Sequence, residues 1–79
     1  MREKVIEQQL VIETKKMKGL CEKWTSGTSG WPDRIVILPG CRIGFVEVKA
    51  PGKEPRPLQV KRHKQLQTLG FKVYVLDDL

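Results

Sequence analysis

Apolar and polar positions alternate along the chain with two periods, and the first period to appear is helical. Residues 2–18 place Ile6, Leu10 and Met17 on one stripe at roughly 100° per residue, which is typical of an amphipathic helix. Gly19 is a natural stop, because glycine readily takes the left-handed conformation that ends many helices. The pattern therefore predicts a first helix that buries one apolar stripe.

Four later segments show the patterns of strands. Residues 20–25, LCEKWT, indicate a first strand, and the Gly/Ser-rich loop that follows carries no core residues. Residues 34–38 and 43–49 flank the turn 39–42, PGCR, and this arrangement indicates a β-hairpin. Residues 71–76, FKVYVL, alternate as a last strand.

A second helix is expected between the hairpin and the last strand. Residues 51–57, PGKEPRP, are a proline-rich polar loop, and residues 58–69 follow as a helix that ends at Gly70. The side chains expected near its inner face are Leu58, Gln65, Leu66 and Leu69. The order α-β-β-β-α-β predicts one α+β domain, residues 1–79, in which helices pack against a small mixed sheet.

Length and composition narrow the class of protein. A chain of 79 residues buries only about 60% of its unfolded surface, so its core is thin and dimerisation would add buried area. An apolar fraction of 39% and a charged fraction of 30% are typical of a globular domain. No apolar run approaches the roughly 20 residues that cross a bilayer, and no apolar signal segment follows the charged start. We therefore expect a cytoplasmic protein without a membrane partner.

Charge and cysteine usage indicate a polyanionic partner and no zinc site. The net charge is +6, which favours nucleic acid as the partner. Cys21 and Cys41 are widely spaced, and His63 is the single histidine, so a zinc site has too few ligands. We expect both cysteines to be reduced, partly buried thiols.

Three charges in the hairpin stand where strands usually bury apolar residues. Glu47 and Lys49 must share one face of their strand, while Val46 and Val48 face the other way. Asp33 precedes the first strand of the hairpin, so the returning chain should bring it close to Glu47. Two carboxylates about 4 Å apart repel by roughly 4 kcal/mol at an effective dielectric constant of 20. A divalent cation reverses the sign of this interaction, because Mg²⁺ and Mn²⁺ prefer oxygen ligands.

Simpler interpretations exist for these charges. The hairpin group is also consistent with an ordinary surface salt bridge to Lys49 or Arg34, which would contribute little. On the first helix, Glu3 and Glu7 share a face that borders the apolar stripe. They point either into a cleft or simply favour the positive end of the helix dipole.

The motifs together resemble a known nuclease family. Pro32-Asp33 followed by Glu47-Val48-Lys49 matches the PD-(D/E)xK pattern. The longer strings GWPDR (30–34) and FVEVKA (45–50), with Leu58-Gln59 opening a helix, resemble the stand-alone VRR-NUC domain, the virus-type replication-repair nuclease often carried by phages. The resemblance covers nearly the whole chain and implies the same αβββαβ fold.

The resemblance also implies roles for individual residues. Asp33 and Glu47 would bind Mg²⁺ or Mn²⁺ with the backbone carbonyl of Val48, and Lys49 would be the catalytic lysine. Glu7 would be the acidic ligand from the first helix, with Glu3 as the alternative if the register differs by one turn. Gln59 would support the site or touch the phosphate, although it is also consistent with an ordinary residue at a helix start.

A basic surface is expected beside this centre. Its members would be Arg34, Lys53, Arg56, Lys61, Arg62 and Lys64, contacting the DNA backbone, although each is also consistent with a solvated position. His63 is expected on the same surface. Trp24 and Trp31 are expected to pack in the core or a dimer interface, with stacking on bases as the alternative.

The resulting hypothesis is a Mg²⁺- or Mn²⁺-dependent endonuclease for branched DNA in replication, recombination or repair. It would resemble Holliday junction resolvases, act as a homodimer on four-way junctions or flaps, and work in a bacterial or phage-infected cell. The alternatives are a DNA-binding module without catalysis and a nuclease subunit of a larger complex. The sequence leaves open the preferred DNA structure, the number of metal ions and the choice between Glu3 and Glu7.

Overall fold

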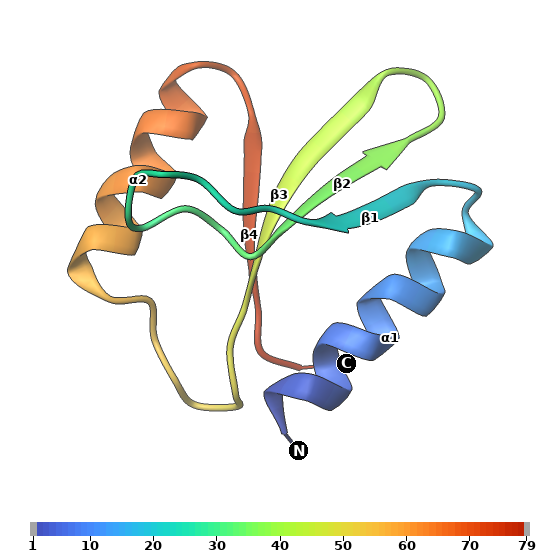
Figure 1. Cartoon of the computed structure of the whole chain (residues 1–79), viewed down its shortest axis with the longest axis horizontal. Coiled ribbons are helices and arrows are strands. Elements are labelled where there is room, and N and C mark those ends of the chain that lie inside the picture. The colour runs from blue at the N-terminus through green and yellow to red at the C-terminus, as the bar shows by residue number, and fades with distance from the viewer. Residues whose placement is uncertain (1, 79) are drawn as a thin grey trace.

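The computed structural model describes residues 2–78 and contains two helices and four strands within that range. The elements are α1 (Glu3–Lys16), β1 (Leu20–Lys23), β2 (Arg34–Leu38), β3 (Arg42–Val48), α2 (Pro57–Thr68) and β4 (Lys72–Leu76). This is the αβββαβ order predicted from the sequence pattern. Figure 1 shows α1 and α2 on opposite sides of the sheet.

The four strands form a mixed sheet in the order β1-β2-β3-β4. β1 pairs with β2, and β2 with β3, in antiparallel fashion, whereas β4 lies parallel to β3. A parallel neighbour requires a crossover connection, and the loop after β3 together with α2 provides it. In the tight turn between β2 and β3, Gly40 and Cys41 both have positive φ, at 84° and 60°.

One face of the sheet packs against α1 around a small apolar core. Ile6 from α1 is fully buried against Val46 and Val48 of β3, and Leu10 and Val36 pack against this cluster. These side chains come from alternate positions of the strand and from one stripe of the helix, as the sequence pattern predicted.

The C-terminal end of α1 differs from the prediction. The inward stripe continues from Leu10 to Thr14, which is buried and donates a hydrogen bond to the Leu10 carbonyl at 2.8 Å. Met17 is half-exposed because it lies beyond the last helical residue. Glycine is required at position 19, because a Cβ atom there would lie only 2.5 Å from the Ile37 carbonyl oxygen.

The opposite face packs against α2 and an aromatic cluster. Phe45 is buried, and its ring lies 5.8 Å from Trp31, 6.3 Å from Trp24 and 5.7 Å from Phe71, measured between ring centroids. The two tryptophans therefore pack within the domain, in agreement with the packing interpretation. Figure 1 shows the segment between β1 and β2 crossing to α2, and Gly30 in that segment lies against the Leu58 backbone.

The inner face of α2 was predicted incorrectly. Of the four side chains expected there, Leu66 is buried, but Leu58 and Gln65 are exposed and Leu69 is 74% exposed. The helix instead turns a partly polar stripe toward the sheet, made of Gln59, His63 and Leu66. Apolar periodicity could not identify this face, because two of its three members are polar.

One of the two cysteines differs from the prediction that both are partly buried thiols. Cys21 and Cys41 are both free thiols; Cys21 is buried, which raises its pKa, whereas Cys41 is exposed. Neither α1 nor α2, the helices within residues 2–78, is long and apolar enough to cross a bilayer.

Candidate active site

The hairpin brings the Asp33 and Glu47 carboxyl groups together. Arg34 is paired with Val46 in the β2–β3 ladder, so Asp33 stands one step beyond that pair, at the level of Glu47. The Asp33 carboxylate accepts a hydrogen bond from the Val48 backbone N–H at 2.9 Å, and it is close enough to Glu47 to raise the pKa of that carboxyl group. The proximity inferred from the spacing of these residues is therefore present in the fold.

Burial and charge make Glu47 an unusual carboxyl group. Its side chain is 1% exposed, and this burial, together with the Asp33 charge and the hydrogen bond to Asp33, raises its pKa to about 8. The nearby Lys49 ammonium acts in the opposite direction. A buried acid next to a second acid destabilises the folded protein. Such pairs are found mainly where a function requires them, so this pair marks a candidate site.

Lys49 follows β3 and faces the same carboxyl group. Its Nζ atom lies 3.9 Å from Glu47 Oε2, and its side chain is mostly buried. The Lys49 backbone N–H donates to the Leu76 carbonyl at 2.9 Å, which extends the β3–β4 ladder by one residue. This bond fixes the backbone from which the ammonium group reaches the site.

Two side chains of α2 also contact the Glu47 carboxyl group. Gln59 donates from Nε2 to Glu47 Oε2 at 3.3 Å, and its own Oε1 accepts from the Arg56 N–H at 2.8 Å. His63 Nε2 lies 3.4 Å from Glu47 Oε1. Gln59 was predicted to support the site, and the contact agrees with that placement.

The expectation that His63 belongs to the DNA-facing surface is wrong. The imidazole is 7% exposed and lies beneath α2, because residue 63 is one helical turn from Gln59 and shares its inward face. Burial, together with the Lys49 charge, lowers the pKa of the imidazole, while the Asp33 charge acts in the opposite direction. The clue in the sequence was the four-residue spacing from Gln59.

Glu7 and Glu3 of α1 interact with different groups. The Glu7 carboxylate accepts a hydrogen bond from Arg34 Nε at 2.8 Å in a largely buried ion pair. Arg34 also donates to the Cys21 carbonyl at 3.3 Å. Glu7 is thus not brought to the Asp33–Glu47 pair. Glu3, the alternative, is the α1 acid whose charge contributes to the raised pKa of Glu47.

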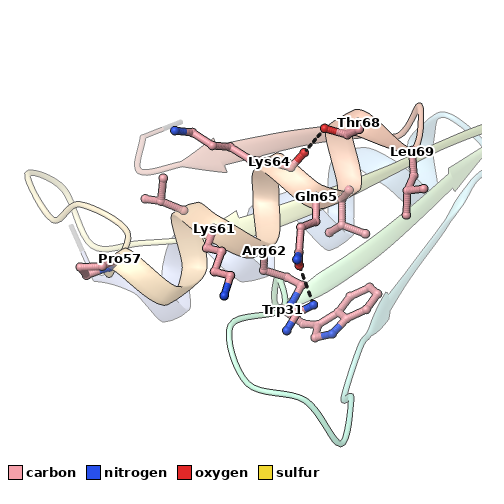
Figure 2. Close-up of a pocket in the computed structure, with 10 residues that line it drawn as sticks. Trp31, Pro57, Lys61, Arg62, Lys64, Gln65, Thr68 and Leu69 are labelled. Atoms are coloured by element: carbon pink, nitrogen blue, oxygen red, sulfur yellow. Dashed lines mark hydrogen bonds between the residues drawn. The ribbon is translucent and has the colours of Figure 1, made fainter.

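The predicted basic surface is only partly assembled. Lys53, Arg56, Lys61 and Lys64 are exposed along α2 and the loop before it, whereas Arg34 is taken up by Glu7. Arg62 lies over the Trp31 ring at 5.9 Å from its centroid and donates to Gln65 at 2.7 Å, as Figure 2 shows. Lys61, Arg62 and Lys64 line an open groove of about 920 Å³ beside Trp31.

The chemistry of the oxygen donors fits Mg²⁺ or Mn²⁺ better than a metal that needs a full cage of side chains. Within residues 2–78 no group of three or more His, Cys, Asp or Glu side chains is arranged to hold a metal. Two carboxyl groups do converge, those of Asp33 and Glu47. Mg²⁺ is commonly bound by one or two carboxylates plus water and substrate phosphate, which matches this limited set.

Comparison with known proteins supplies independent findings. No family model matches the chain. A phage protein, "Putative nuclease p44" from Acyrthosiphon pisum secondary endosymbiont phage 1, is 49% identical over 78 residues, covering 98% of this chain and 84% of that protein. A solved structure titled "VRR_NUC domain" matches with a TM-score of 0.85 and 33% identity, covering 99% of this chain and 87% of that one. The chain therefore belongs to the VRR-NUC family of nucleases.

Proposed function

We propose that the chain is a Mg²⁺- or Mn²⁺-dependent endonuclease that hydrolyses phosphodiester bonds in branched DNA. The observation that carries the proposal is the convergence of Asp33, Glu47 and Lys49 at one end of the hairpin. Membership in a nuclease family supports the reaction class. The proposed location is the cytoplasm of a bacterial or phage-infected cell.

Each residue of the centre has a distinct proposed role. Asp33 and Glu47 would hold the cation, together with the Val48 backbone carbonyl. The bound cation would polarise a phosphoryl oxygen and lower the pKa of a water molecule. The Lys49 ammonium would stabilise the negative charge that grows on the phosphate, or orient the attacking water. As the water oxygen bonds to phosphorus, one phosphate ester bond breaks and the strand is nicked.

For the acid from α1, we propose Glu3 in place of Glu7. The Arg34 guanidinium already neutralises Glu7 in a buried pair, whereas the charge of Glu3 acts on Glu47. Glu3 would add negative potential near the cation.

The DNA track would follow the exposed basic side chains of α2 and the preceding loop. Lys53, Arg56, Lys61 and Lys64 are available to phosphates, and Arg62 stands at the edge of the groove beside Trp31. Phosphate contacts carry no base information, so binding should weaken steeply with salt and depend little on sequence. Arg34 is left out of the track because of its pair with Glu7.

The preferred substrate is proposed to be a four-way junction or flap, cut by a homodimer. A thin core favours association, since a second copy would bury more apolar surface. A two-fold dimer would place one centre on each of two opposing strands, because its symmetry matches that of the junction. Sedimentation of the protein alone and with junction DNA measures the stoichiometry directly.

Cleavage of labelled four-way, flap and linear duplex DNA with Mg²⁺, Mn²⁺ or a chelator tests the proposal. We expect metal-dependent nicking that Asp33→Asn reduces at least 100-fold and that the exposed variant Glu13→Gln leaves intact. Cleavage that survives the chelator, or an Asp33→Asn protein as active as wild type, refutes the proposed chemistry. Binding without any cleavage would favour the non-catalytic DNA-binding alternative.

A further inference from the structure

We propose that His63 is a positioning residue for the Glu47 carboxylate, acting with Gln59 to fix how that carboxylate faces the cation. The inference rests on the proposed function, in which Glu47 holds Mg²⁺ or Mn²⁺. It assigns a role to a buried side chain that the proposed chemistry leaves unused. His63 itself would touch neither the cation nor the DNA.

The two α2 contacts address different oxygen atoms of the same carboxyl group. Gln59 Nε2 lies 3.3 Å from Oε2, and His63 Nε2 lies 3.4 Å from Oε1. Rotation of the Glu47 carboxyl group about its last bond would therefore break both contacts together. Because residues 59 and 63 are one turn apart on a single helix, the two contacting nitrogen atoms are held in a fixed relation to each other.

The orientation of the Gln59 amide follows from its other contact. Its Oε1 accepts the Arg56 backbone N–H at 2.8 Å, at the start of α2. An amide has one oxygen and one NH₂ group, so this bond turns the NH₂ toward Glu47. The start of the helix thus determines the group that Gln59 presents, and His63 supplies the second contact.

A packing role is the competing explanation, and the surroundings of His63 argue against it. A thin core gains most from apolar side chains, yet this face buries His63 against Glu47, which is 1% exposed. Carboxylates that bind metals are in turn hydrogen-bonded, and losing such a supporting contact typically weakens metal affinity about 10- to 100-fold. The arrangement is therefore expected to matter for the cation more than for the fold.

Mn²⁺ binding to the DNA-free protein, followed by electron paramagnetic resonance, provides the first test. We expect His63→Leu to weaken Mn²⁺ binding about 10- to 100-fold, whereas His63→Gln, which keeps an N–H donor at similar reach, recovers most of the affinity. Gln67→Ala, an exposed change on the same helix, is the control. Wild-type affinity in a folded His63→Leu protein overturns the inference and leaves the proposed function standing.

The second test needs no substitution at His63, which protects it against a variant that fails to fold. His63 is the single histidine, so its imidazole nitrogen signals in an NMR spectrum are unambiguous. We expect these signals to shift when Mg²⁺ saturates the wild-type protein and to stay in place in Glu47→Gln. Absence of a shift in a protein that binds Mg²⁺ overturns the inference, whereas a wild-type protein that binds no Mg²⁺ or Mn²⁺ overturns the proposed function as well.

Discussion

Replacing Glu47 with glutamine should remove a pH-dependent loss of stability from the metal-free protein. The carboxyl group is 1% exposed, and its pKa rises from an ordinary 4.5 to about 8 in the folded state. The folded protein therefore holds this proton more tightly than the unfolded chain does. The stability that the proton contributes is fully present below pH 4.5 and is lost as the pH rises through about 8.

The size of the effect follows from the shift. A difference of 3.5 pKa units, 8 minus 4.5, corresponds to about 5 kcal/mol over the full range, at about 1.4 kcal/mol per unit. Between pH 5.5 and 7.5 the loss is about 2–3 kcal/mol. A domain of this length has a total stability of roughly 4–12 kcal/mol, so the melting temperature should fall by about 10–20 °C over that interval.

Thermal and urea unfolding in a chelator, followed by circular dichroism at several pH values, measures this directly. We expect the stability of Glu47→Gln minus that of wild type to grow with pH, while Glu13→Gln, an exposed substitution on α1, follows the wild type. Saturating Mn²⁺ should stabilise the wild type and leave Glu47→Gln unchanged, because binding to the folded state alone adds to stability. A difference between wild type and Glu47→Gln that is constant from pH 5.5 to 8.5 would refute the reasoning.

Three further outcomes test other parts of the structure. Lys49→Met should lower the cleavage rate about 100- to 1,000-fold with Mn²⁺ binding retained, measured by single-turnover assay; a parallel loss of Mn²⁺ binding would contradict its assigned role. Glu7→Gln should lower the free energy of unfolding by about 1–3 kcal/mol in urea, because it leaves the largely buried Arg34 guanidinium without its charged partner; lost Mn²⁺ affinity at unchanged stability would instead make Glu7 a ligand. Lys61→Ala and Lys64→Ala should each reduce the slope of log affinity against log salt by about 1, measured by DNA titration, and an unchanged slope would place both lysines outside the track.

The pattern of apolar and polar residues along the sequence was sufficient to predict the helices and strands and the approach of Asp33 to Glu47. A hairpin with a short turn has a nearly determined register, so the spacing of Asp33 and Glu47 already implied their meeting. Alternation along β3 likewise separated Val46 and Val48 from Glu47. Both inferences depend on contacts within or between neighbouring segments, where periodicity carries the information.

Tertiary packing decided which polar side chains surround that pair. The inward face of α2 follows from its docking beside Glu47, so His63 is buried although apolar periodicity favoured other positions. The Glu7–Arg34 pair joins residues 27 positions apart, and it removed one acid and one base from their expected roles. Periodicity along one element does not report which side chain of another will lie opposite, because that depends on how the two elements dock.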